Sequence, residues 1–289
     1  ASNLIVLYVA WELTSVSSYL LVGWNDEDPS ARAAALQALL TTGLGGLAML
    51  GGFVVIGQAA GTYDLAAIAA APPTGTAVSV GLVLVLVGVA TKSAQVPFSS
   101  WLPGAMVAPT IVSAYLHSAT MVKAGVYLVA RLAPVFADQG PWRPVVLVLG
   151  IVTMVSGGWR ALGQHDLKRI LAFGTISQLG FLVILFGIGS PEATAAGVAL
   201  LVAHALFKAC LFLVVGTVDH AAGTRDIRRL GRYGPGWAVP KALAVLSGAS
   251  MAGIPLLFGF VGKESALAAL VEGHGPGTAP ALVGVVVGS

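Results

Sequence analysis

The sequence predicts an all-α, polytopic transmembrane helix bundle, and three observations carry this prediction. Of the 289 residues, 57% are hydrophobic and only 9% are charged, whereas a soluble domain carries about a quarter charged residues. The mean hydropathy is +0.90. The apolar runs are long, rich in Ala, Leu and Gly, and lack the alternation typical of strands. This composition excludes a soluble globular domain, a nucleic-acid binder and a disordered chain.

Nine apolar runs predict the membrane spans, since about 20 apolar residues cross the hydrocarbon core of a bilayer. They cover about 3–24, 33–58, 77–108, 110–135, 143–160, 168–189, 193–218, 239–271 and from 278 onward. The first and last runs look incomplete, so we expect a fragment of a longer protein.

Two of these runs are interrupted in the middle, and we expect both to be broken helices. The interruptions fall at Pro97, Pro103, Gly104 and Pro109 in the third run, and at Gly253, Pro255, Gly259 and Gly262 in the eighth. A lysine accompanies each one. Paired broken helices at matching positions are typical of transporters built from structural repeats. We therefore predict two five-helix units, 1–135 without its first helix and 136–289 with its last helix truncated, although Pro and Gly are common in membrane helices in any case.

The loop charges predict the orientation. Nine cations lie in or near the loops after the first, fifth and seventh runs: Arg32, Arg160, Lys168, Arg169, Arg225, Arg228, Arg229, Arg232 and Lys241. Only Arg131 and Arg143 lie on the opposite side. Because basic residues accumulate in cytoplasmic loops, the first set is expected in the cytoplasm.

Several charged residues fall deep inside the apolar runs, where each one costs about 2.5–3.5 kcal/mol on insertion scales. They are Glu12, Lys92, Lys123, Lys208, Lys263 and Glu264, accompanied by His117 and His204. All four deep cations are lysines, although nine of the fifteen basic residues are arginines. Arginine stays protonated, whereas a buried lysine can release its proton. The pattern therefore indicates groups that load and unload protons.

Spacing suggests how these groups are arranged. Glu12 is the only deep carboxylate of the first half, so we expect it to be the counter-ion of Lys92. His204 and Lys208 are four residues apart and share one helix face. His117 and Lys123, six apart on a continuous helix, would face different neighbours.

Other interpretations of these residues stay open. A lysine near a helix end, Lys263 above all, can extend its ammonium group to the membrane surface without any function. His117 and His204 could ligate haem. The sequence holds no Walker motif, nucleotide-binding glycine loop, nucleophile elbow or Cys cluster, and its one cysteine, Cys210, excludes an internal disulfide. We expect no cofactor, metal or catalytic site, and an ion transporter rather than an enzyme.

Seven segments carry a resemblance to a known family. They are WELTSVSSYLLVGW (11–24), TKSAQVPFSSWLPGAM (91–106), APTIVSAYLHSATMVKAGVYLVAR (108–131), DLKRILAFGTISQLG (166–180), HALFKACLF (204–212), DHAAGTRDIRRLG (219–231) and SMAGIPLLFGFVGKES (250–265). The sequence resembles the large A subunit of Mrp-type multisubunit Na⁺/H⁺ antiporters, a family similar to the antiporter-like L subunit of respiratory complex I. The 219–231 loop is more similar to the Mrp family than to the complex I family.

The resemblance implies a fold and residue roles. The two five-helix units would be inverted repeats. A proton would move along Lys123, His117 and Lys92, biased by Glu12, and leave through His204, Lys208 and Lys263. The resemblance also implies a multi-pass subunit in a bacterial cell membrane, with H⁺, Na⁺, lipid and other Mrp subunits as partners and no nucleic acid. Lysine and histidine do not bind Na⁺, so its path is expected to involve sequence outside this chain.

Three positions depart from the family pattern, and two other functions remain open. The family often has His at the position of Leu200, Pro at that of Ile111 and Ser at that of Gly262. A proton-pumping subunit of NADH:quinone oxidoreductase is the first alternative, because the same residues would then couple to quinone reduction. A structural membrane scaffold is the second, and it predicts that replacing the deep lysines by leucine is neutral or stabilising.

Overall fold

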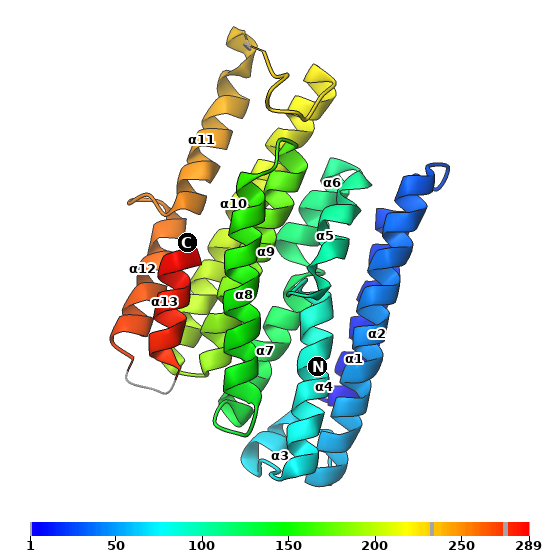
Figure 1. Ribbon diagram of the computed structural model, residues 1–289, viewed down its shortest axis with the longest axis vertical. Coiled ribbons are helices and arrows are strands. Elements are labelled where there is room, and N and C mark those ends of the chain that lie inside the picture. Colours follow the sequence, from blue (N-terminus) through cyan, green and yellow to red (C-terminus); the bar gives the residue numbers. More distant parts are fainter. Residues whose placement is uncertain (1, 232–233, 274–276, 289) are drawn as a thin grey trace.

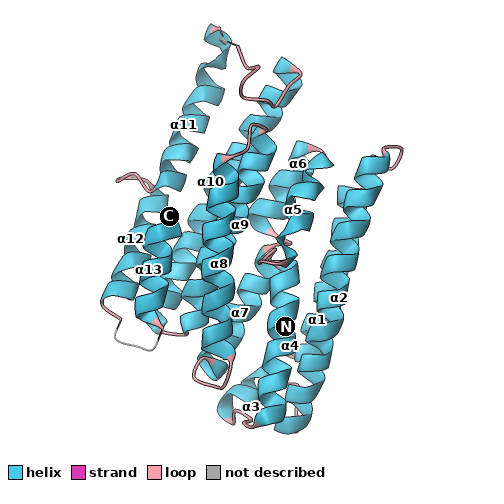
Figure 2. Ribbon diagram, in the orientation of Figure 1, coloured by secondary structure: helices cyan, strands magenta, loops and turns pink. Residues whose placement is uncertain are grey.

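A computed structural model describes residues 2–231, 234–273 and 277–288. The described residues form a bundle of helices without a β-strand (Figures 1 and 2). Six helices, counting 110–136 as one, are long and apolar enough to cross a membrane, and this confirms the predicted all-α transmembrane class. Arg232, one of the cations used to predict the orientation, lies outside the described residues. Nothing in the structure tests the division into repeats at 135, which stays a prediction.

The α-helices follow the predicted runs closely. They are α1 (Leu4–Val22), α2 (Pro29–Ala60), α3 (Leu65–Ala70), α4 (Thr76–Lys92), α5 (Trp101–Gly104), α6 (Thr110–Ala114), α7 (Lys123–Phe136), α8 (Trp142–Leu162), α9 (Leu167–Ile188), α10 (Pro191–Ala222), α11 (Ala238–Ala252), α12 (Phe258–Val271) and α13 (Thr278–Gly288). Short 3₁₀ turns lie at Phe98–Ser100, Ala105–Val107 and Pro235–Trp237, and a π-helical turn lies at Tyr115–Ala119.

Short polar residues and glycines set the ends of the long helices. Asp28 caps α2 by accepting the backbone N–H of Ser30 (2.8 Å), and a proline follows at the first helical position. Asp166 caps α9 in the same way, through the N–H of Arg169 (3.0 Å). At the other end, α10 stops at Gly223, whose φ of 62° lies in the left-handed region that glycine tolerates.

The first interruption begins directly after Lys92, where α4 ends. The backbone then turns through Ala94 at φ 49° and the cis Val96–Pro97 bond before the short helices resume at Phe98. Hydrogen bonds to distant helices hold this segment: Val96 N–H donates to Thr153 Oγ1 on α8 (2.9 Å), and Ser93 Oγ donates to the carbonyl of Val122 (2.6 Å). The segment after Lys92 is therefore fixed by tertiary contacts rather than by a helical ladder.

The run 110–135, expected to be one continuous helix, is interrupted as well. After α6 the chain forms the π-helical turn that contains His117, and Thr120 then leaves the helix at φ −122°, ψ −88°. The helix resumes as α7 at Lys123. The expected helical angle between His117 and Lys123 is therefore wrong, because no continuous helix joins them.

A further interruption separates α11 from α12, which continues in a similar direction beyond it (Figure 1). Gly253 and Leu256 both adopt positive φ, at 84° and 74°. A Cβ on Gly259 would lie 1.8 Å from the carbonyl oxygen of Ser250, so only glycine lets the two helices approach this closely.

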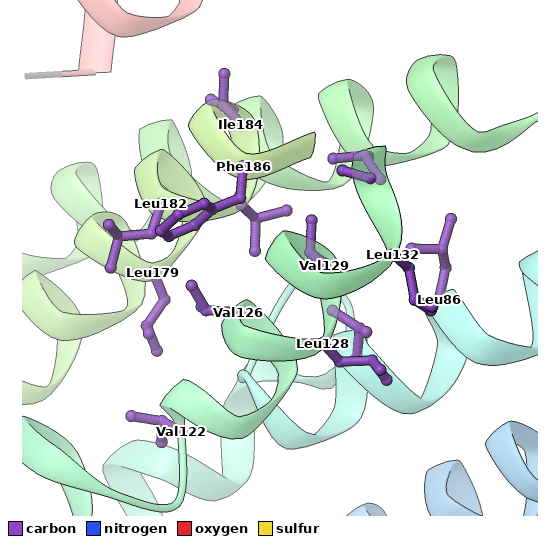
Figure 3. Packing of buried hydrophobic residues seen from close by; sticks show 14 of the residues in the cluster. Leu86, Val122, Val126, Leu128, Val129, Leu132, Leu179, Leu182, Ile184 and Phe186 are labelled. Carbon is purple, nitrogen blue, oxygen red and sulfur yellow. The ribbon is translucent and has the colours of Figure 1, made fainter. Parts of the chain in front are cut away.

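The hydrophobic core lies between α4, α7 and α9, and α9 is buried along nearly its whole length. Figure 3 shows the two sides of α7 in this core: Leu86 of α4 lies beside Leu132 of α7, whereas Leu179 and Leu182 of α9 lie on the side of Val126. The polar side chains described next are set into the edges of this core.

Candidate functional site

Lys92, the last residue of α4, is fully buried, and its side chain reaches α1. Its Nζ donates to the carbonyl of Trp11 (3.1 Å) and to the hydroxyl of Ser15 (2.7 Å), and it lies 5.3 Å from the centre of the Trp11 ring. Trp11 and Ser15 are one helical turn apart, so a single face of α1 supplies all three contacts. Neutral dipoles and an aromatic face therefore surround the ammonium group.

Glu12 does not form the expected direct ion pair with Lys92. No salt bridge joins the two among the described residues, although they are within electrostatic range. Glu12 is one residue beyond Trp11 and so points about 100° away on α1. Its Oε1 is buried against Gly46 of α2 and has no hydrogen-bond partner among the described residues. Ser15, which accepts the hydrogen bond from Lys92, lies three residues after Glu12 on the same helix.

Lys123 begins α7 and connects it to α10. Its side chain is 8% exposed, and Nζ donates to the carbonyl of Leu201 (3.2 Å). The preceding residue, Val122, accepts the hydrogen bond from Ser93, which follows Lys92. The chain segments that carry the two lysines are thus connected by this hydrogen bond between the Ser93 side chain and the Val122 backbone.

His204 and Lys208 lie one turn apart on α10, and both are fully buried, as their spacing predicts for a shared face. Lys208 Nζ donates to the carbonyl of Leu171 (3.1 Å) on α9. Neither ring nitrogen of His204 has a partner among the described residues. His204 lies within electrostatic range of both Lys123 and Lys208.

His117 approaches the residues of α10, and it does not approach Lys123, which follows it in the sequence. It is fully buried, its ring centre is 5.8 Å from that of Phe212, and neither nitrogen has a partner among the described residues. The cations within its electrostatic range are Lys168 and Lys208. His117 and Lys123 therefore do face different neighbours, although the helical geometry assumed for this was wrong.

Lys263 crosses the interruption between α11 and α12. Its Nζ donates to the carbonyl of Ala252 (3.3 Å), at the end of α11. The adjacent Met251 places its sulfur 3.7 Å from Lys208 Nζ, so two consecutive residues of α11 connect Lys208 with Lys263. Gly262 and Leu200, two of the residues that depart from the family pattern, also lie against each other here. A Cβ on Gly262 would be 2.9 Å from Cα of Leu200.

Lys168 was missed as a candidate, since a lysine in the first turn of a helix normally extends to water. It is instead 1% exposed, and its Nζ donates to the carbonyl of Ala108, just before α6. Its position inside an apolar run, three residues after His165, was the available signal. Its burial depends on the segment at Ala108 lying over it.

One property is common to these lysines. Each of the five donates a hydrogen bond to a carbonyl or hydroxyl oxygen: Lys92, Lys123, Lys168, Lys208 and Lys263. None of them forms a salt bridge among the described residues. A carboxylate partner would lock the ammonium form, because the loss of its proton would leave a buried negative charge unpaired. A neutral oxygen leaves the amine form accessible. This cluster can therefore accept and release protons.

A known family model matches nearly the whole chain. Residues 1–288 match the membrane domain described as "NADH:quinone oxidoreductase/Mrp antiporter, TM". Among curated relatives, the probable K(+)/H(+) antiporter A/B subunit of Rhizobium meliloti is 49% identical over 95% of this chain and 28% of its own length. The Na(+)/H(+) antiporter A subunit of Alkalihalophilus pseudofirmus is 45% identical over 94% and 36%. The chain thus spans about a third of these relatives.

Solved structures are similar as well. A chain of the Mrp complex from Dietzia sp. matches with a TM-score of 0.92 and 40% identity, over 99% of this chain and 32% of that one. A chain of the membrane-bound sulfane sulfur reductase, an archaeal respiratory membrane complex, matches with a TM-score of 0.90 and 27% identity, over 99% and 60%.

Proposed function

Because the chain belongs to the membrane-domain family shared by NADH:quinone oxidoreductase and the Mrp antiporters, we propose that it is the proton-translocating part of a multisubunit cation/proton antiporter. The observation that carries the proposal is the set of buried lysines held by neutral oxygens. The proposed partners are other antiporter subunits, H⁺ and Na⁺ in a bacterial cell membrane.

The proposed route uses Glu12, Lys92, His117, Lys123, His204, Lys208 and Lys263. Because His204 is within electrostatic range of both amines, the proposed order has Lys123 exchange a proton with Lys208 by way of His204. Lys208 then communicates with Lys263 through the end of α11. Each protonated amine disfavours protonation of the next, so a charge gained at one position drives a proton onward from its neighbour.

Lys92 and Glu12 act as the control element of this route. Glu12 lies within electrostatic range of Lys92, so a change of charge on Glu12 alters the field at the Lys92 ammonium. Ser93 and Val122 connect the Lys92 segment to Lys123. A shift of the backbone at Lys92 is thus transmitted to the start of α7.

The two aromatic nitrogens of each buried histidine have no partner among the described residues. Buried polar atoms in native proteins are almost always hydrogen-bonded, often to water. We propose that water molecules complete the path at His117 and His204. This proposal uses the histidines as proton carriers and assigns them no haem.

Replacement of Lys92 by alanine in the complete antiporter complex tests the route. In everted membrane vesicles, Na⁺-dependent collapse of a pH gradient, followed with a fluorescent ΔpH dye, should be abolished while the protein remains inserted. Lys241→Ala is the matched control, because Lys241 is exposed on α11 and lies outside the route; it should keep wild-type exchange. Full exchange in Lys92→Ala would refute the route.

Lys208→Arg separates a titrating group from a fixed cation. Arginine keeps the positive charge but does not release its proton, so exchange should fail although the charge at this position is conserved. Wild-type exchange would make Lys208 a structural cation. Neutral or stabilising effects of replacing the deep lysines by leucine would support a scaffold instead.

The likeness to a respiratory membrane complex supports coupling to redox chemistry as a second candidate function. Co-purification decides between the two: small antiporter subunits support the antiporter, and Fe–S and flavin proteins support the respiratory pump. The exchanged cation is tested by replacing Na⁺ with K⁺ or choline in the same vesicles, since the names of the relatives include both Na⁺ and K⁺.

A further inference from the structure

Three arginines converge on a hollow at one end of the bundle, away from the buried lysine route. The arginine hollow, with a volume of about 470 Å³, is lined by Arg160 from the last turn of α8, Arg169 from the first turn of α9 and Arg225 from the loop after α10. Its other lining residues are Ser100, Pro103, Gly104, Met106, Val107, Asp166 and Phe173. Four separate segments of the chain thus build one basic cavity with an apolar wall.

The charges in the arginine hollow are not balanced internally. Its one carboxylate, Asp166, is engaged by Arg225 Nε (3.2 Å) and by the backbone N–H of Arg169 (3.0 Å). The guanidinium groups of Arg160 and Arg169 form no hydrogen bond or salt bridge with the described residues. Two cations with fork-shaped donors therefore face a cavity that offers them no anion, and a phosphate group matches that geometry.

Exposed apolar residues place the arginine hollow at the surface of the membrane. Trp159 and Leu162, in the same final turn as Arg160, are 79% and 83% exposed, and Val107 in the wall is 44% exposed. Tryptophan accumulates at the level of the lipid headgroups, where one part of the ring is apolar and another is polar. An occupant of this hollow would reach water at its charged end and hydrocarbon at the other.

We propose that the arginine hollow binds the phosphate headgroup of an anionic phospholipid, with the acyl chains directed along the apolar wall. Basic pockets between transmembrane helices at the membrane surface favour such headgroups. The guanidinium groups of Arg160 and Arg169 bind the phosphate oxygens. Arg225, already paired with Asp166, closes the third side. None of its lining residues belongs to the proposed proton route.

The test titrates phosphatidylglycerol into the complete complex in an uncharged detergent, with bound lipid counted by native mass spectrometry. Phosphatidylcholine and inorganic phosphate are titrated in parallel. A single cation near an anionic lipid contributes roughly fivefold in affinity. Arg160→Gln and Arg169→Gln should therefore each weaken phosphatidylglycerol binding by about fivefold, and together by about 25-fold, with little change for phosphatidylcholine.

The matched control is Arg229→Gln, which removes the same charge from an exposed residue of the loop after α10, outside the hollow. It should change the affinity less than twofold. An equal loss in this control would indicate diffuse attraction and overturn the site, as would unchanged affinity in the double variant.

Inorganic phosphate distinguishes the two sources of the phosphate group. Displacement of the lipid by millimolar inorganic phosphate would overturn the assignment to a phospholipid. If the double variant is unstable, lipid binding is measured with Arg160→Lys instead. Lysine keeps the charge but loses the fork of donors, so this variant should weaken phosphatidylglycerol binding, but less than Arg160→Gln does.

Discussion

Replacement of Gly46 by alanine tests whether the position of the Glu12 carboxyl controls the exchange. A Cβ at this position would lie 2.0 Å from Oε1 of Glu12 and 3.2 Å from its Cδ, whereas an ordinary contact begins at 3.4 Å. The carboxyl must therefore move by about 1.4 Å, the difference between the first and last of these distances. The end of a flexible side chain can make this movement, so the fold should tolerate the change.

The displacement alters the field that Glu12 exerts at Lys92. A misplacement of about 1 Å in a reacting group can reduce a rate roughly 100-fold, and we expect a loss of exchange of this order in Gly46→Ala. The assay is the vesicle pH-gradient measurement on the complete complex. The amount of inserted protein is measured by immunoblot, so that loss of protein is not mistaken for loss of exchange.

Two further variants make this test specific. Gly43→Ala, one turn earlier on α2, adds the same methyl group where nothing lies within 4 Å, and it should keep wild-type exchange. Glu12→Asp shortens the side chain by one methylene, so in the Gly46→Ala background it should restore part of the activity. Wild-type exchange in Gly46→Ala, or equal losses at both glycines, would refute the positioning of Glu12 by Gly46.

Two other predictions concern stability. Thr153→Val removes the acceptor for the Val96 N–H in the interruption after α4 and should lower the stability by about 1 kcal/mol, measured by thermal unfolding in detergent, with Thr153→Ser retaining most of it. Hydrogen bonds from Arg228 lower the pKa of Asp226 to about 2 from 3.8, so its contribution to the loop after α10 is complete above pH 3.8 and is lost as the pH falls through about 2. In the unchanged protein, pepsin should cleave this loop faster only as the pH falls from 3.8 towards about 2. In Asp226→Asn, cleavage should already be faster at pH 4. Equal cleavage rates of the two proteins at pH 4 would contradict this prediction.

The positions of most helices could be predicted from the sequence, because the length of an apolar run is a local property. The run at 168–189 became α9 (Leu167–Ile188), and the run at 143–160 lies within α8 (Trp142–Leu162). The interruption before Lys123 could not be predicted, since no proline or glycine marks it. Tertiary contacts define it: Ser93 bonds to Val122, and Gly125 allows α7 to approach this serine.

Most of the buried charged residues and histidines, Lys168 excepted, could also be identified from the sequence, but not their partners. Whether Lys92 meets Glu12 or its neighbour Trp11 depends on the rotation of α1 about its axis, and adjacent residues differ by about 100° in that rotation. The burial of Lys168 depends on where the segment at Ala108 lies. Both are properties of packing between helices, and the run of residues around each lysine does not contain them.

The length of α10 determines how deep the central groups lie. At 1.5 Å per residue its 32 residues extend about 48 Å, and a tilt above 50° would be needed to confine it to a hydrocarbon layer of about 30 Å, beyond the usual range of tilts. The helix therefore projects past the hydrocarbon layer. His204 is about 20 Å and Lys208 about 26 Å from its first residue, on either side of its midpoint. With a hydrocarbon layer of about 30 Å centred on the helix, both groups lie roughly 10–20 Å from each surface of that layer, so a proton exchanged at either group would have to be relayed to both sides of the membrane.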